Sequence, residues 1–137
     1  SEEAYIMKKS TLVCIGAVSA FTFAPASFAD INDDLANICT IVKNDDKSEL
    51  RKKLRDVQNN YRLRLGDYYT GISCGGNSLI RYAMENGSTE TGTYMIKRMG
   101  VSELTAAEKD GMPLQDWAQN NGYIESEIGK ELLARIN

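Results

Sequence analysis

The sequence contains no histidine. Histidine is the most frequent general base and a common metal ligand, so its absence excludes serine and cysteine triads built on it, together with most zinc and haem sites. A nucleotide-binding loop is also missing, because the glycines of Cys74-Gly75-Gly76-Asn77 are not followed by the lysine and hydroxyl residue that hold phosphates. We therefore expect no catalytic residue, no cofactor and no metal site.

Apolar runs long enough to span a membrane are lacking as well. The most extended run covers residues 11–23, whereas a spanning helix needs about 20 apolar residues. Two lysines precede it, and small residues ending at Ala29 follow it, which is the pattern of a secretory signal peptide. We expect residues 1–29 to comprise an upstream segment and a cleavable signal that begins at Met7. Residues 30–137 would then form one domain in the periplasm.

Cysteine is scarce, with three residues in the chain. Cys14 lies in the expected signal, which leaves Cys39 and Cys74. An isolated pair in an oxidising compartment is most simply one disulfide, and the loop it closes corresponds to about 3.8 kcal/mol in the chain-entropy treatment. A redox-active pair usually has two residues between its cysteines, so we expect a structural bond.

The first part of the domain has helical spacing. The apolar residues Ile31, Leu35, Ile38 and Val42 follow steps of four, three and four, which predicts one face of a helix. Asp46 with Glu49 predicts the start of a second helix, whose inward face would hold Leu50, Leu54 and Val57.

The other face of that second helix is basic and carries Arg51, Lys52, Lys53 and Arg55. We expect a solvated helix face, with contact to anionic lipid as the alternative. The formal net charge of the chain is −3, which is not the signature of a nucleic-acid-binding protein, and we expect no nucleic-acid partner.

The periodicity changes at about residues 61–72. Tyr61, Leu63 and Leu65 alternate with arginines, Gly66-Asp67 suits a two-residue turn, and alternation resumes from Tyr68. This pattern predicts a short β-hairpin. A prolonged helix is the alternative, because residues 54, 61, 65 and 68 also have helical spacing.

Residues 75–91 are nearly repeated by residues 110–126. With a shift of 35, Tyr82 matches Trp117 and Ala83 matches Ala118, and each unit has a glycine before the helix and Asn-Gly after it. The pattern predicts a helix with its aromatic and alanine inward, a glycine-dependent end and a second helix. Such hairpins must stack to bury their apolar faces, and residues 33–58 supply a third, diverged pair.

Two resemblances follow from these motifs. The repeat, most clearly "GMPLQDWAQNNG", is similar to ankyrin repeats, although the usual Thr-Pro-Leu-His is missing. Residues 38–99, with "ICTIVKNDDKSELRKKLR" and "GISCGGNSLIRYAMENG", resemble an uncharacterised family of small exported proteobacterial proteins, domain-of-unknown-function family thirty-seven eighteen. That family is marked by Cys-Asn-Gly, where this chain has Cys74-Gly75-Gly76. The resemblance implies no activity.

The sequence thus predicts a mainly α-helical, ankyrin-like array with a disulfide staple. We expect a non-catalytic module that binds an unknown protein partner in the periplasm, with a small envelope-associated enzyme or a lipid-binding protein as the alternatives. The expected binding surface is the loop side of the array and comprises Tyr68, Tyr69, Gly75, Gly76 and Asn77.

Overall fold

The computed structural model describes residues 31–137. The expected upstream segment and signal, including Cys14, lie outside the described residues. The chain divides into two units, Ser1–Asp34 and Leu35–Asn137, and the second unit contains the helix pairs, the disulfide and the cavities described below. No helix within the described part of the chain is long and apolar enough to cross a membrane.

The unit Leu35–Asn137 is built from helices, and no named strand occurs among the described residues. In chain order they are α3 (Ile38–Lys43), α4 (Lys47–Tyr61), α5 (Leu65–Tyr68), the 3-10 helix η2 (Tyr69–Gly71), α6 (Leu79–Asn86), α7 (Thr89–Lys97), α8 (Val101–Thr105), α9 (Leu114–Asn120) and α10 (Glu127–Ile136). The prediction of a mainly α-helical protein is therefore confirmed.

The first expected helix is interrupted. Residues 35–37 form a turn, and Asn37 has a φ of 68°, in the left-handed region that asparagine tolerates. A helix running without a break from Ile31 to Val42 is thus wrong, although Leu35, Ile38 and Val42 are buried as expected. The spacing therefore identified buried residues correctly. The left-handed residue Asn37 nevertheless interrupts the helix between Leu35 and Ile38.

The second expected helix is confirmed as α4. The Glu49 N–H donates to the side chain of Asp46 at 3.2 Å, which caps the helix start. Leu50, Leu54 and Val57 are buried along one side. The helix ends at Tyr61, because the next residue, Arg62, has a left-handed φ of 61° that cannot continue it.

The predicted β-hairpin at 61–72 is wrong, because α5 and η2 occupy this segment. The Arg64 N–H donates to the carboxylate of Asp67 at 2.8 Å, so Gly66-Asp67 forms the first turn of a helix instead of a hairpin turn. Leu65 and Tyr69, four residues apart, are both buried. The segment folds as helix because this spacing buries both side chains, although its alternating residues suggested strands.

The two repeated units form the helix pairs α6/α7 and α9/α10. Ala83 and Ala118 are fully buried, and Gly87 at the end of α6 has a φ of 64°. Trp117 is buried as predicted, but Tyr82 is half-buried, and its neighbour Arg81 is buried instead. The repeat therefore holds for the backbone, while the buried side chains differ between the units.

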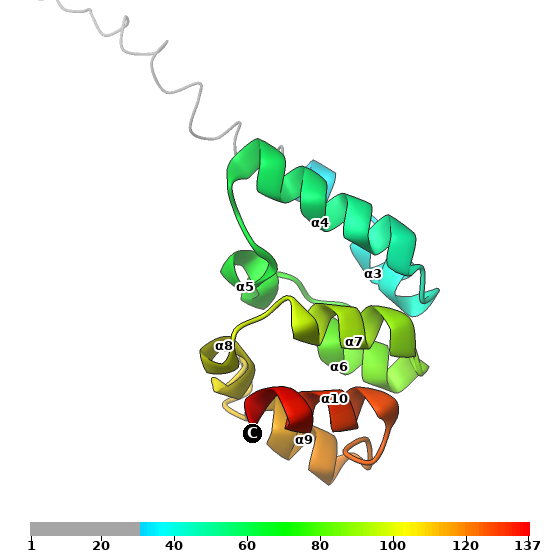
Figure 1. Ribbon diagram of the computed structural model, residues 1–137, viewed down its shortest axis with the longest axis vertical. Helices are drawn as coiled ribbons and strands as arrows, with labels where there is room; N and C mark the ends of the chain where they lie inside the picture. The colour runs from blue at the N-terminus through cyan, green and yellow to red at the C-terminus, as the bar shows by residue number, and fades with distance from the viewer. Residues whose placement is uncertain (1–30) are drawn as a thin grey trace, which may run out of the picture. The chain divides into compact units, whose positions relative to one another are not determined.

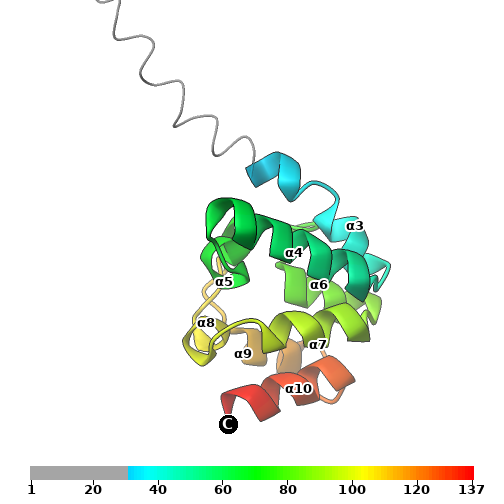
Figure 2. The ribbon, with the colours of Figure 1, turned by 45° about the horizontal axis from the view of Figure 1, so that its top comes forward.

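The three helix pairs of this unit stack in order. The first helices form one layer, in which α6 contacts both α3 and α9, and the second helices form another, in which α7 contacts both α4 and α10. Figure 1 shows the pairs one above the other, and Figure 2 shows the same succession after rotation. Short helices, α5 with η2 and then α8, lie in the connections between successive pairs.

A disulfide links Cys39 of α3 to Cys74, which lies in the connection that leads into α6. The bond thus ties the first helix pair to the loop before the second. Cys74 also forms an isolated antiparallel bridge with Asn77, so the covalent bond and the backbone hydrogen bonds act on one short turn.

Candidate functional site

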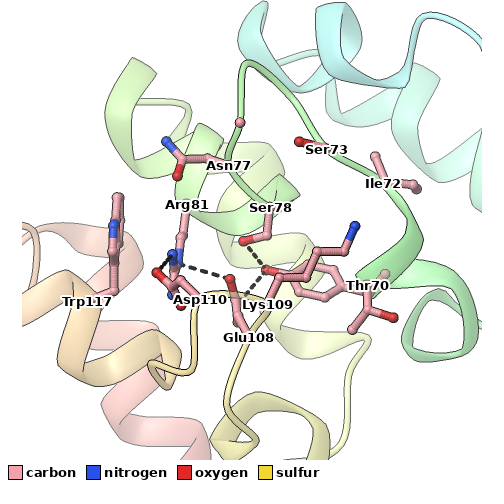
Figure 3. A pocket seen from close by; sticks show the side chains of 12 residues that line it. Thr70, Ile72, Ser73, Asn77, Ser78, Arg81, Glu108, Lys109, Asp110 and Trp117 are labelled. Carbon is pink, nitrogen blue, oxygen red and sulfur yellow. Dashed lines mark hydrogen bonds and ion pairs between the residues drawn. The ribbon is translucent and has the colours of Figure 1, made fainter.

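A cavity of about 200 Å³ lies where the two connections approach each other beside α6 and α9. Figure 3 shows that residues after α5, the turn before α6 and the loop before α9 surround it. Its lining consists of Tyr69, Thr70, Ile72, Ser73, Gly76, Asn77, Ser78, Arg81, Glu108, Lys109, Asp110 and Trp117. Residues from two successive helix pairs therefore form a single site.

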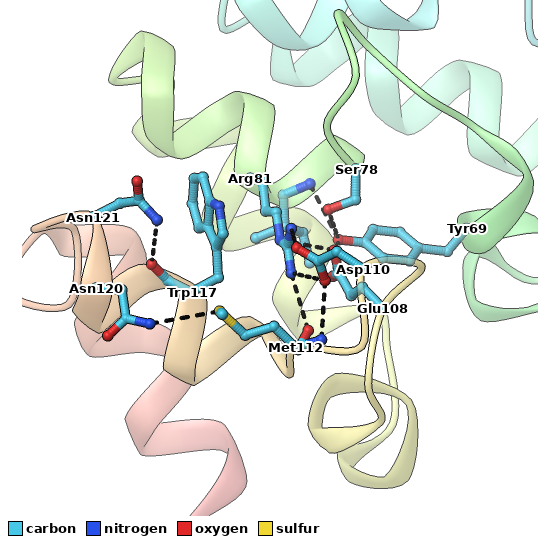
Figure 4. Close-up of polar contacts among 10 residues, drawn as sticks. Tyr69, Ser78, Arg81, Glu108, Asp110, Met112, Trp117, Asn120 and Asn121 are labelled. Carbon is cyan, nitrogen blue, oxygen red and sulfur yellow. Dashed lines mark hydrogen bonds and ion pairs between the residues drawn. The ribbon is translucent and has the colours of Figure 1, made fainter.

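Arg81 lies at the centre of the polar contacts in this cavity and is 5% exposed. Its Nη1 and Nη2 donate to the two carboxylate oxygens of Asp110 at 2.7 and 3.1 Å, and Nη2 also donates to the Met112 carbonyl at 3.0 Å (Figure 4). Its Nε forms an ion pair with Glu108 Oε1 at 2.9 Å without hydrogen-bond geometry. A buried guanidinium requires such partners, so Arg81 holds the loop before α9 against α6.

The same contacts change two pKa values. Burial lowers the pKa of Arg81, but the hydrogen bond to Asp110 and the charges of Glu108 and Asp110 outweigh burial and leave that pKa raised. The hydrogen bond from Arg81 and that from the Met112 N–H lower the pKa of Asp110 to about 2. The pair is therefore ionised on both sides at neutral pH.

Tyr69 closes the cavity on the side of η2 and is 4% exposed. Its hydroxyl hydrogen-bonds to Ser78 Oγ at 2.8 Å and to Glu108 Oε2 at 3.1 Å, and it accepts from the Ile80 N–H at 3.4 Å. Burial and the carboxylate of Glu108 raise the pKa of Tyr69 well above its ordinary value. The phenol therefore keeps its proton at neutral pH and cannot act as a base toward Ser78.

Trp117 forms the opposite wall and is 9% exposed. The Arg81 Cζ lies 5.0 Å from the centre of the indole ring, a cation–π arrangement. The indole also stacks on Tyr123 with ring centres 5.4 Å apart. The expected core residue is thus both a packing residue and part of the cavity wall.

The turn at residues 74–77 forms the rim. The Cys74 N–H donates to the Asn77 carbonyl at 2.7 Å, and the Asn77 N–H donates back at 3.1 Å. Gly75 and Gly76 have φ values of 60° and 90°, and asparagine tolerates the first of these values whereas the second favours glycine. The glycines of Cys74-Gly75-Gly76 therefore suit the backbone of this turn.

The structure brings together part of the surface expected from the sequence. Tyr69, Gly76 and Asn77 line the cavity, whereas Tyr68 and Gly75 do not. Tyr69 is buried instead of presented on the surface. The Tyr68 hydroxyl is also buried and has no hydrogen-bond partner, and burial, with the charge of Asp67 and the nearby Tyr94, raises the pKa of Tyr68.

Sequence reasoning missed Arg81, Glu108 and Asp110. A signal was present for Arg81, because it interrupts the apolar run of α6 between Ile80 and Ala83. The acids flank Lys109 in a connection without periodicity, so nothing local marked them as partners of an arginine 29 residues away. The residues described by the structure contain no cluster of acids or cysteines suited to a metal ion.

The fold and the site define a class: a small disulfide-linked stack of helix pairs with a polar pocket between two pairs. Within that class the chain belongs to the family described as "Protein of unknown function (DUF3718)", whose profile matches residues 38–106. The match includes α3 to α8, the disulfide and Arg81, and it ends just before Glu108. Neither the search of curated proteins nor the search of solved structures returned a match.

Proposed function

We propose that this protein is an exported, non-catalytic binding module whose 200 Å³ cavity receives a side chain of a protein partner. The observation that carries the proposal is the cavity itself, which two separate connections build around a pre-paired arginine. A cavity rigidly held by a disulfide, ion pairs and a stacked indole is preorganised for binding.

The size of the cavity favours a protein partner over a small molecule. Pockets for small ligands and cofactors have volumes of about 300–1,000 Å³, and this one is smaller. Protein interfaces are anchored by a few side chains that fill well-packed pockets on the partner. The cavity therefore suits one side chain supplied by a larger surface.

The charges around the cavity favour an uncharged side chain with an aromatic or apolar body. The charges of Arg81 and Lys109 are matched by those of Glu108 and Asp110. Both Nη atoms of Arg81 already donate to Asp110 and Met112. The indole of Trp117 offers a flat apolar wall, on which an aromatic or apolar group packs well.

The alternative of a small enzyme is less well supported. Ser78 is connected to the acid Glu108 only through the hydroxyl of Tyr69, which lies between them. Since burial raises the pKa of Tyr69, its phenol keeps its proton and does not activate Ser78 as a base. Binding without chemistry is the function that these contacts support.

Two further parts of the proposal concern architecture and location. The two layers of successive helices, α3-α6-α9 and α4-α7-α10, support an ankyrin-like array, and such arrays bind partners along extended surfaces. The disulfide supports an oxidising compartment, and we propose the periplasm. Protein recovered from that compartment would then lack residues 1–29 and carry no free thiol.

Site-specific photo-crosslinking in living cells tests the binding proposal. A photo-reactive amino acid replaces Lys109, which is exposed beside the cavity. A matched control places the same amino acid at Lys130, which is exposed on α10 and does not line the cavity. We expect a discrete crosslinked protein from position 109 and none from position 130.

A second variant links capture to the cavity. Thr70→Trp changes an exposed residue of η2 that lines the cavity, and the larger side chain should fill the space. The crosslink from position 109 should then disappear while the melting temperature stays within a few degrees. Equal capture at both positions, or capture that survives Thr70→Trp, contradicts the proposal.

A further inference from the structure

A second cavity of about 300 Å³ lies between α4 and the end of α7. Its lining comprises Arg51, Leu54, Arg55, Gln58, Tyr94 and Arg98. Half of these residues are arginines, and they come from segments far apart in the sequence. None of them lines the cavity beside Trp117.

Three cations lie close to one aromatic ring that lines this second cavity, and two of them, Arg51 and Arg98, also line it. The Arg51 Cζ lies 5.7 Å and the Arg98 Cζ 6.0 Å from the centre of the Tyr94 ring, and the Lys47 Nζ also lies 6.0 Å from it. An aromatic face attracts cations at this range and orients a planar guanidinium. The ring therefore collects three positive charges that would otherwise repel one another.

These arginines are not neutralised within the described part of the chain. No carboxylate there forms an ion pair with Arg51, Arg55 or Arg98. The contrast with Arg81 is direct, because that arginine has two carboxylate partners. Each guanidinium carries five N–H donors, so the second cavity presents many unused donors and an uncompensated positive charge.

A phosphate group supplies the hydrogen-bond acceptors and the negative charge that this group of arginines lacks. Its several oxygens accept paired hydrogen bonds from guanidinium groups, and its negative charge offsets their mutual repulsion. We propose that Arg51, Arg55 and Arg98, which line this cavity together with Tyr94, form a binding site for a phosphate group. The group is either a soluble phosphate compound or the headgroup of an anionic phospholipid.

The site differs from a generally basic surface in a way that can be tested. Lys52 is on the same helix as Arg51, but it pairs with Asp56 at 3.8 Å and does not line the cavity. Arg51→Gln, Arg98→Gln and Lys52→Gln each remove one positive charge from the same neighbourhood. If the site is localised, binding requires the charges of Arg51 and Arg98 but not that of Lys52.

Titration calorimetry with inorganic pyrophosphate, and flotation with vesicles containing phosphatidylglycerol, are the two probes, both at 0.15 M salt. Neutral phosphatidylcholine vesicles are the control. Arg51→Gln and Arg98→Gln should each weaken binding by about tenfold or more, the scale expected for a charged hydrogen-bonding contact. Lys52→Gln should weaken it by less than about threefold, because salt screens exposed charges outside the contact.

Either source of the phosphate group supports the site. Pyrophosphate binding with this variant pattern assigns it to soluble phosphate compounds, and vesicle binding alone with the same pattern assigns it to a lipid headgroup. The proposal is overturned if neither probe binds, or if Lys52→Gln weakens binding as much as the arginine variants. Thr70→Trp should leave this binding unchanged, which separates it from the cavity beside Trp117.

Discussion

Gly92 provides a test of the contact between successive helix pairs. It is buried in α7, and a Cβ atom placed there would lie 2.5 Å from Cδ1 and 2.8 Å from Cγ1 of Ile128 in α10. The same atom would lie 3.3 Å from the Cβ of Ala83 in α6. Gly92→Ala therefore introduces a methyl group where three helices meet.

The expected magnitude follows from these distances. Carbon atoms pack at about 3.5–4.0 Å, so the Ile128 side chain must move by about 1 Å, and overpacking of this kind costs about 1–3 kcal/mol. Alanine is better than glycine inside a helix by about 0.5–1 kcal/mol. We expect Gly92→Ala to lower the free energy of unfolding by about 1–2 kcal/mol.

The effect of Gly92→Ala on the free energy of unfolding should change sign when Ile128 is shortened. Ile128→Ala removes both atoms of the close contact, at its own cost of about 2–5 kcal/mol. In that background Gly92→Ala should stabilise the protein by about 0.5–1 kcal/mol, because the helix preference remains and the two closest contacts, those with Ile128, are gone. The coupling of about 2 kcal/mol exceeds the roughly 0.5 kcal/mol expected for independent sites.

Urea unfolding followed by circular dichroism, with the disulfide intact, measures all four free energies. Gly71→Ala is the matched control, because no atom lies within 4 Å of a Cβ at that position, and it should change the free energy by less than about 1 kcal/mol in either direction. An equal effect of Gly92→Ala in both Ile128 backgrounds would refute the proposed packing of α7 on α10.

Three further predictions concern the disulfide and the site. Replacing both Cys39 and Cys74 with alanine should lower the free energy of unfolding by about 3.8 kcal/mol, since the disulfide closes a loop with a sequence separation of 35. Urea unfolding of the oxidised wild type and of the variant measures this difference. Arg81→Met should cost about 3–5 kcal/mol because it leaves the 13% exposed Glu108 side chain without its ion pair, and adding Glu108→Gln should recover part of the loss in the same assay. The folded-state pKa of Asp110 lies below its ordinary value of 3.8, at about 2. The contribution of this carboxylate to the stability of the fold is therefore present above pH 3.8 and is lost as the pH falls through 2. Asp110→Asn should flatten the pH dependence of the melting temperature between these pH values.

The helical repeats could be predicted from sequence because they depend on local spacing. The apolar spacing of Leu50, Leu54 and Val57, and the alanines that permit close helix contact, are visible in a short window. The segment after α4 could not be predicted in this way. Its alternating residues suited a strand, and the structure makes a helix there because Leu65 and Tyr69 are buried together.

The sequence by itself determined the helix pairs of the two repeated units, the start of α4 and the pairing of Cys39 with Cys74, because periodicity, glycine turns and a cysteine count are local or combinatorial properties. Only the tertiary structure decided that Arg81 is buried, that Glu108 and Asp110 neutralise it, and that Arg98 joins Arg51 beside Tyr94. The physical reason is that charge compensation depends on distance in space. Stacked helix pairs bring together side chains whose separation along the chain carries no sign of their contact.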